Sequence, residues 1–223
     1  MNILVSLQIK FTTMQEIKNT TTYKESLKEK ILSAAMSLFI EKGIKAVKMD
    51  DIANSLSISK RTIYEICENK EDLLFEGVKR QHIARQDVMR EFAAVADNVM
   101  DIILHSFRLT IEQFKYTNPV FYSDLLRYPK ILKYLEEDKR NAQQQFLDFL
   151  HRGVGEGYFR DDINYDLIIY ILSAQEKYIM MSQLYNMYSM EEVFYNLIFI
   201  SLRGICTSKG IEVLDNFLIN IKA

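Results

Sequence analysis

A run of polar side chains between residues 59 and 64 has chemistry suited to binding nucleic acid. Two cations and several hydroxyl groups lie together at the predicted start of a helix, and such groups bind phosphate oxygens. A short helix of this width also fits the major groove of DNA. A solvated polar face on an ordinary helix explains the composition equally well. The run consists of Ser59, Lys60, Arg61, Thr62 and Tyr64.

Two short helices joined by a turn are predicted to position this run. The first covers about 49–56, with Ile52 on its inner face, and the second covers about 60–66. Ile63 of the second helix returns to the same small core, so its polar neighbours occupy the outer faces. Ser59 stands where its hydroxyl can cap the second helix. This arrangement is a helix-turn-helix.

Longer helices are predicted on both sides of this pair. The preceding helix begins at the segment TYKE, where Thr22 and Glu25 have the spacing of a capping box. It ends at Gly43. The following helix begins after Asn69, whose side chain can cap it, and continues to about residue 90. Three helices and a connecting helix therefore occupy the N-terminal part of the chain.

The whole chain is predicted to be all-α. Its 223 residues are 48% hydrophobic, which is enough to bury a core without disulfides or metals. Only two prolines and seven glycines interrupt apolar residues that recur at spacings of three and four. Further helices are expected at about 95–116, 119–126, 130–153, 164–186 and 190–207, with a last short one at 210–220.

Charge and cysteine content limit the class of protein. The formal net charge is −2, so total charge gives no sign of a nucleic-acid partner and only local placement can. Cys67 and Cys206 lie far apart, which favours a reducing cytoplasm and two buried thiols over a disulfide or zinc site. Residues 1–20 lack a basic segment and a cleavage site, so we expect a poorly ordered extension instead of a signal peptide. We expect no membrane-spanning segment.

The segment AAMSLFIEKGIKAVKMDDIANSLSISKRTIYEICENKEDLL resembles the N-terminal domain of TetR-type transcriptional regulators. The likeness covers about residues 24–80 and includes EKG, DDIA, ISKRTIY and NKEDLL in order. It implies a helix-turn-helix DNA-binding domain at 21–70, a connecting helix at 71–90, and a helical-bundle ligand-binding and dimerisation domain at 91–223.

The resemblance also assigns roles to single residues of the N-terminal domain. It implies phosphate contacts for Lys48, Tyr64 and Lys70. It implies that Lys60, Arg61 and Thr62 contact bases, or bases together with phosphates. Ser59 is expected both to cap the helix and to contact DNA.

Four positions depart from the family pattern, and one of them is Ile66, which stands where histidine or tyrosine is common. Lys48 stands where a threonine often opens the second helix, and it is expected to reach a phosphate by charge. Ser57 replaces a turn glycine and would cost about 1 kcal/mol if its φ is positive. Cys67 replaces an aromatic residue and is expected to loosen packing between the third and fourth helices.

The C-terminal part resembles the family more weakly. The resemblance implies a homodimer formed through the helices at about 164–186 and 190–207, a palindromic double-stranded DNA operator, and an unknown small-molecule ligand. Aromatic side chains are candidates to line the ligand pocket, although core or dimer packing explains each of them too. The candidates are Phe107, Phe114, Phe121, Tyr122, Phe146, Phe149, Tyr170 and Tyr178.

Polar residues in apolar helices leave alternatives open. His105 is expected to be a core histidine, and Glu176 with Lys177 could serve a pocket or an interface salt bridge.

An enzyme is not expected, because the three histidines lack metal-ligand spacing and no nucleophile elbow is present. We predict no catalytic residue, metal or cofactor. The favoured function is a cytoplasmic repressor released from its operator by a small ligand. The alternative is a helical ligand-binding or protein-interaction dimer that no longer binds DNA.

Overall fold

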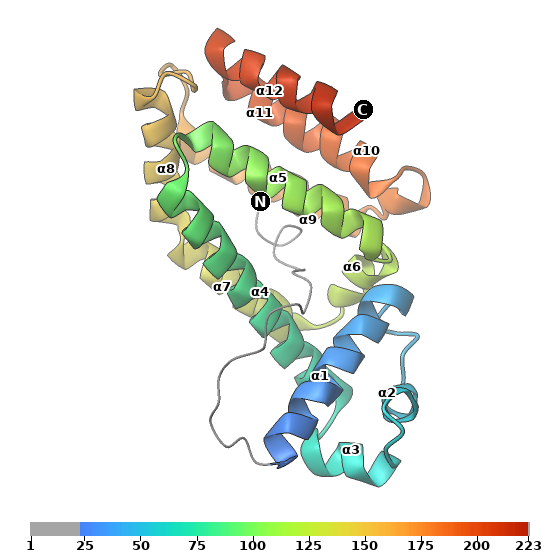
Figure 1. The fold of residues 1–223 in the computed structure, drawn as a ribbon. Helices are drawn as coiled ribbons and strands as arrows, with labels where there is room; N and C mark the ends of the chain where they lie inside the picture. Colours follow the sequence, from blue (N-terminus) through green and yellow to red (C-terminus); the bar gives the residue numbers. More distant parts are fainter. Residues whose placement is uncertain (1–22, 223) are drawn as a thin grey trace. The chain divides into compact units, whose positions relative to one another are not determined.

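The computed structural model of the protein describes residues 23–222 (Figure 1). In that range the regular elements are all helical, and a single isolated bridge joins Phe159 to Cys206. The all-α prediction is thereby confirmed. The predicted extension at 1–20 and the capping role of Thr22 lie outside the described residues. Among the described helices, none is long and apolar enough to cross a membrane.

The described residues form two compact units. The first unit comprises residues 23–86 and 116–132, and the second comprises 87–115 and 133–222. The first unit contains α1 (Tyr23–Lys42), α2 (Met49–Ser55), α3 (Lys60–Ile66), α6 (Val120–Leu125) and the larger part of α4 (Lys70–Val95).

The first unit is built around the apolar face of α1. Ile31, Ala35 and Phe39 follow one another at four-residue spacing and are fully buried. This face packs against α2, α3 and α6. Gly43 ends α1 with a φ of 85°, a left-handed conformation that glycine adopts without strain, as its position in the sequence predicts.

The second unit is a bundle with an aromatic core. Phe107 lies edge-on to Phe194, with ring centroids 5.2 Å apart, and 4.8 Å from Phe199. The unit contains α5 (Val99–Tyr116), most of α7 (Pro129–Asn141), α8 (Gln143–Gly155), α9 (Tyr165–Met181), the 3₁₀ turn η1 (Leu184–Asn186), α10 (Met190–Phe194), the π-helical turn η2 (Tyr195–Phe199), α11 (Ile200–Ile205) and α12 (Ser208–Lys222).

Three predicted helices differ from the structure. The helix expected at 164–186 ends at Met181, and η1 follows after Gln183, whose φ is 52°. The helix expected at 130–153 is divided at Ala142 into α7 and α8, and no glycine or proline in the sequence marks the division. The helix expected at 190–207 contains the π-helical turn η2 between α10 and α11. Its predicted start is confirmed, because Ser189 and Glu192 form a capping box.

Both cysteines are buried thiols, as predicted. Burial raises the pKa of Cys206 to about 11 and also raises the pKa of Cys67. Since the thiolate is the reactive form, both side chains are inert near neutral pH and serve packing.

Candidate nucleic-acid interface

The helix-turn-helix of the first unit consists of α2, a short turn and α3. Ile52 and Ala53 of α2 are buried together with Ile63 of α3, as the sequence predicts. Ser57 in the turn has a φ of 54°, so the condition under which the sequence predicts a cost of about 1 kcal/mol is met. The buried contacts fix α3 by one face and leave its other faces to solvent.

The start of α3 is capped by a side chain. Ser59 Oγ accepts a hydrogen bond from the backbone N–H of Thr62 at 3.0 Å, so the predicted cap is confirmed. The hydroxyl groups of Ser59 and Thr62 also lie 2.8 Å apart in a hydrogen bond. Both hydroxyls therefore have fixed positions at the helix N-terminus.

The exposed faces of α3 carry two cations and a phenol. Lys60 pairs with Asp50 of α2 at 2.9 Å, and this hydrogen bond raises the pKa of Lys60. Arg61 is 89% exposed in its side chain and pairs with Glu65 one turn later. Tyr64 is 46% exposed. Water screens both ion pairs, so the cations can exchange their carboxylates for DNA phosphates or bases at small cost.

Lys70 at the start of α4 binds inside the first unit. Its ammonium donates to the backbone carbonyls of Ile44 and Val47, each at 2.9 Å. Burial lowers the pKa of Lys70, and the carboxylate of Asp124 opposes this effect. An ammonium has three donors, so two carbonyls do not saturate it. Because Ile44 and Val47 lie in the loop between α1 and α2, the two hydrogen bonds let Lys70 hold this loop.

Asp124 of α6 holds the same loop from its N–H side. Its Oδ2 accepts from the backbone N–H of Lys45 at 2.7 Å, and the residue is only 5% exposed. Asn118, just before α6, donates to the carbonyls of Ile40 and Glu41 at the end of α1. Sequence reasoning missed this support. The only signal was an acidic residue inside the apolar segment FYSDLL.

Lys48 is exposed immediately before α2. Its backbone N–H donates to Asp51 Oδ2 at 2.7 Å, which supports the first turn of α2. The side chain itself lies on the surface. All seven residues that the resemblance implies for DNA contact thus belong to the first unit.

The eight candidate ligand residues do not form one cluster. Phe107 and Phe114 belong to the aromatic core of the second unit, whereas Phe121 packs on Tyr122 in the first unit. Phe146 stacks on Phe149, with ring centroids 6.3 Å apart. The remaining two, Tyr170 and Tyr178, are exposed on α9.

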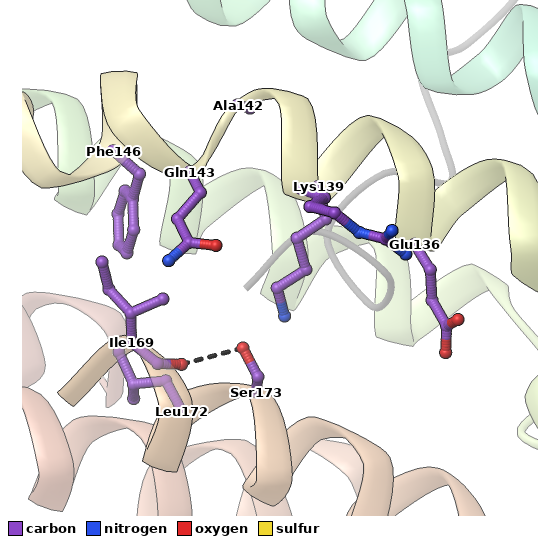
Figure 2. A pocket seen from close by; sticks show the side chains of 9 residues that line it. Glu136, Lys139, Ala142, Gln143, Phe146, Ile169, Leu172 and Ser173 are labelled. Atoms are coloured by element: carbon purple, nitrogen blue, oxygen red, sulfur yellow. Dashed lines mark hydrogen bonds between the residues drawn. The ribbon is translucent and has the colours of Figure 1, made fainter. Parts of the chain in front are cut away.

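A cavity of about 290 Å³ lies in the second unit (Figure 2). Phe146 is the member of the candidate set that lines it. Its other lining residues are Glu136, Lys139, Arg140, Ala142, Gln143, Ile169, Leu172 and Ser173.

The polar residues that left alternatives open have separate places in the second unit. Glu176 pairs with Lys139 at 2.6 Å, and Lys177 is exposed. His105 stacks on Phe92 with ring centroids 3.9 Å apart.

A buried helix pair with a capped, cation-bearing second helix defines a helix-turn-helix DNA-binding protein. Residues 31–76 match the sequence model of the bacterial regulatory proteins of the tetR family. The transcriptional repressor KstR2 of Mycobacterium tuberculosis is 26% identical over 151 residues, 64% of this chain and 74% of the relative. The biofilm operon regulator IcaR of Staphylococcus epidermidis is 38% identical over 53 residues, 24% of this chain and 29% of the relative.

Two solved structures share the fold. The ketosteroid transcriptional regulator KstR2 of M. tuberculosis has a TM-score of 0.56 at 20% identity, covering 86% of this chain and 98% of that one. A TetR/AcrR-family regulator from Thermobifida fusca has a TM-score of 0.56 at 21% identity, covering 80% and 98%. Residues 31–76 therefore form a helix-turn-helix domain of the tetR family, and the curated relatives that the chain resembles are DNA-binding transcriptional repressors.

Proposed function

We propose that this repressor binds a palindromic operator in the cytoplasm as a homodimer and leaves it when a small ligand binds the second unit. The observation that supports DNA reading is the outer surface of α3, where cations surround the buried Ile63. Lys60, Arg61 and Thr62 contact bases, with Ser59 beside them. Lys48, Tyr64 and Lys70 contact phosphates.

An exposed apolar face on α9 supports the dimer. Leu167, Ile171, Tyr178 and Met181 follow one another at helical spacing and are 42–61% exposed. Ile200 of α11 is also exposed, at 64%. Gln175 and Ser201 hydrogen-bond each other at 3.0–3.1 Å and so tie α9 to α11. A twofold mate would cover this apolar face, since water exposure of such a surface is unfavourable.

The ligand is proposed to be mainly apolar. The related KstR2 is described as a ketosteroid regulator, and one wall of the cavity in the second unit is apolar, formed by Phe146, Ile169 and Leu172. A ligand releases the operator only if it binds more tightly to the conformation whose DNA-reading helices misfit the two half-sites.

Selection of bound sequences from a random duplex library, at near-physiological salt, tests the proposal. Wild type should recover a palindrome whose half-sites are about 34 Å apart. The Lys60→Ala/Arg61→Ala variant should recover none. A control, Arg90→Ala/Lys133→Ala, removes two exposed cations outside α3 and should recover the wild-type site.

Failure to enrich any site with a folded wild-type dimer would contradict operator binding. Enrichment by the Lys60→Ala/Arg61→Ala variant would contradict the assignment of base reading to α3. Recovery of single, unpaired half-sites would contradict the dimer.

A further inference from the structure

The cavity in the second unit is amphipathic. It lies between the α7–α8 junction and α9, and Figure 2 shows Phe146, Ile169 and Leu172 on one side with Lys139 and Glu136 on the other. Ile169 is buried and Phe146 and Leu172 are half-buried, so this side offers an apolar wall. The cavity of about 290 Å³ is close to the lower limit for small-molecule sites, which begin near 300 Å³.

The polar side of the cavity has an excess of positive charge. Lys139 and Arg140 provide two cations and Glu136 provides one carboxylate, so the residues that line the cavity carry a net charge of +1, while the carboxylate of Glu176, which is not among them, pairs with Lys139. Gln143 adds an amide that can donate hydrogen bonds to an oxygen. Charge and donors together suit an oxyanion better than a cation.

Lys139 is held in place at this end. Its ammonium lies 2.6 Å from Oε2 of Glu176, which is 3% exposed on α9, whereas Lys139 keeps 25% exposure. Burial lowers the pKa of Lys139. One carboxylate does not saturate an ammonium, which has three donors, so a second oxygen can bind beside Glu176. The buried pair positions Lys139 before any ligand arrives.

We propose that the cavity binds an amphipathic carboxylic acid, with its carboxylate on Lys139 and its apolar body against Phe146, Ile169 and Leu172. This inference rests on the proposed function and gives the ligand a chemical class. Arg140 and Gln143 would bind the same carboxylate from the α7–α8 side. Neutral compounds of equal shape would lose the charge-assisted hydrogen bonds and bind more weakly.

Isothermal titration calorimetry with three ten-carbon probes tests the class directly. Decanoate, decan-1-ol and decylamine share an apolar body and differ in the head group, and each is used below its aggregation concentration. Wild type should bind decanoate at least about tenfold more tightly than the alcohol, the effect of one charge-assisted hydrogen bond, and the amine most weakly. Equal affinity for acid and alcohol, or preference for the amine, would overturn the proposal.

Variants locate the carboxylate. Lys139→Met keeps the aliphatic stem, so it should bind acid and alcohol equally, and Lys139→Arg should restore the preference. Lys133→Met removes an exposed cation from the same helix and should behave as wild type. Should loss of the buried pair unfold Lys139→Met, the double variant Lys139→Met/Glu176→Leu removes both charges and takes its place. A retained preference for decanoate in either would overturn the role of Lys139.

Operator binding, measured separately by fluorescence anisotropy, distinguishes this inference from the proposed function. Operator binding without decanoate binding would reject the cavity and leave the repressor function intact. Decanoate binding that leaves operator affinity unchanged would confirm the site and reject ligand release. Absence of operator binding would reject the proposed function whatever the calorimetry gives.

Discussion

At the residue scale, the position of the helix-turn-helix depends on side chains outside α2 and α3 as well as on its own core. Lys70 and Asp124 hold the α1–α2 loop from its carbonyl and its N–H sides. The loop leads directly into α2, so these hydrogen bonds fix where the helix-turn-helix begins. Asp124 is therefore a positioning residue that sequence reasoning did not identify.

The Asp124→Ala variant should lower both stability and operator affinity. It removes a buried carboxylate, leaves the partly buried Lys45 N–H without its acceptor and takes away the charge near Lys70, which should lower the free energy of unfolding by about 1–3 kcal/mol. Urea denaturation measures the stability, and anisotropy with the selected operator measures the affinity. Asp162→Ala removes an exposed, ion-paired aspartate and serves as control. Wild-type values for both quantities would show that Asp124 has no positioning role.

Tyr64 and Arg61 of α3 should differ in the kind of DNA contact that they make. Tyr64→Ala is expected to weaken binding to operator and random DNA by the same factor, because phosphate contacts carry no sequence information. Arg61→Ala is expected to lose about 1–3 kcal/mol more on the operator than on random DNA, because a base contact is lost. Titration of operator and random DNA at one salt concentration gives, for each variant, the ratio of its affinity to that of wild type on each duplex. Equal losses for Arg61→Ala would assign it to phosphate.

At the element scale, the turn between α2 and α3 contains strain that a single substitution can relieve. Ser57 adopts a φ of 54°, whereas glycine adopts this conformation freely. Ser57→Gly should therefore raise the free energy of unfolding by about 0.5–1 kcal/mol, less the entropy that glycine adds to the unfolded chain. Chemical denaturation measures the difference.

Ser55→Gly is the matched control for that prediction. Ser55 lies in α2, and its hydroxyl donates to the carbonyl of Ile52 at 2.8 Å. Glycine inside a right-handed helix costs about 0.5–1 kcal/mol, so this variant should be less stable than wild type. If both variants are destabilised equally, the turn is not strained.

Local signals explain which elements the sequence could predict. The start of α3 at Ser59 and of α10 at Ser189 depend on side chains three residues apart, and both were predictable. Membership of α6 in the first unit was not, because the Asp124 contact to Lys45 spans 79 residues of sequence. The division at Ala142 was also hidden, since no glycine or proline lies beside it.

Candidate site residues show the same contrast. The polar side chains of α3 were predictable because Ile63 fixes which faces point outward. The cavity was not, because helical spacing does not distinguish a buried aromatic ring from one that lines a hollow. Phe107 and Phe146 both lie on amphipathic helices, yet one lies in the core and the other lines the cavity.

At the scale of the whole molecule, a net charge of −2 cannot by itself attract the chain to DNA. Operator affinity must then come from the local cations of α3 and from binding two half-sites at once. Joining two weak binding modules raises affinity by about 10²–10⁴ through effective concentration alone. The proposed dimer should therefore contribute as much to operator affinity as any contact to a base.

The Tyr178→Glu variant should separate the contribution of dimerisation to operator affinity from that of the cations of α3. Tyr178 is 61% exposed on the apolar face of α9, and a carboxylate buried there in a dimer would face apolar side chains without a partner. We expect a folded monomer in sedimentation velocity, with affinity for the full palindrome falling toward that for one half-site. Tyr116→Glu places the same charge at a tyrosine 59% exposed at the end of α5 and should remain dimeric with full affinity. A Tyr178→Glu variant that stays dimeric would place the twofold interface elsewhere, whereas a monomer with undiminished palindrome affinity would show that operator binding needs no dimer.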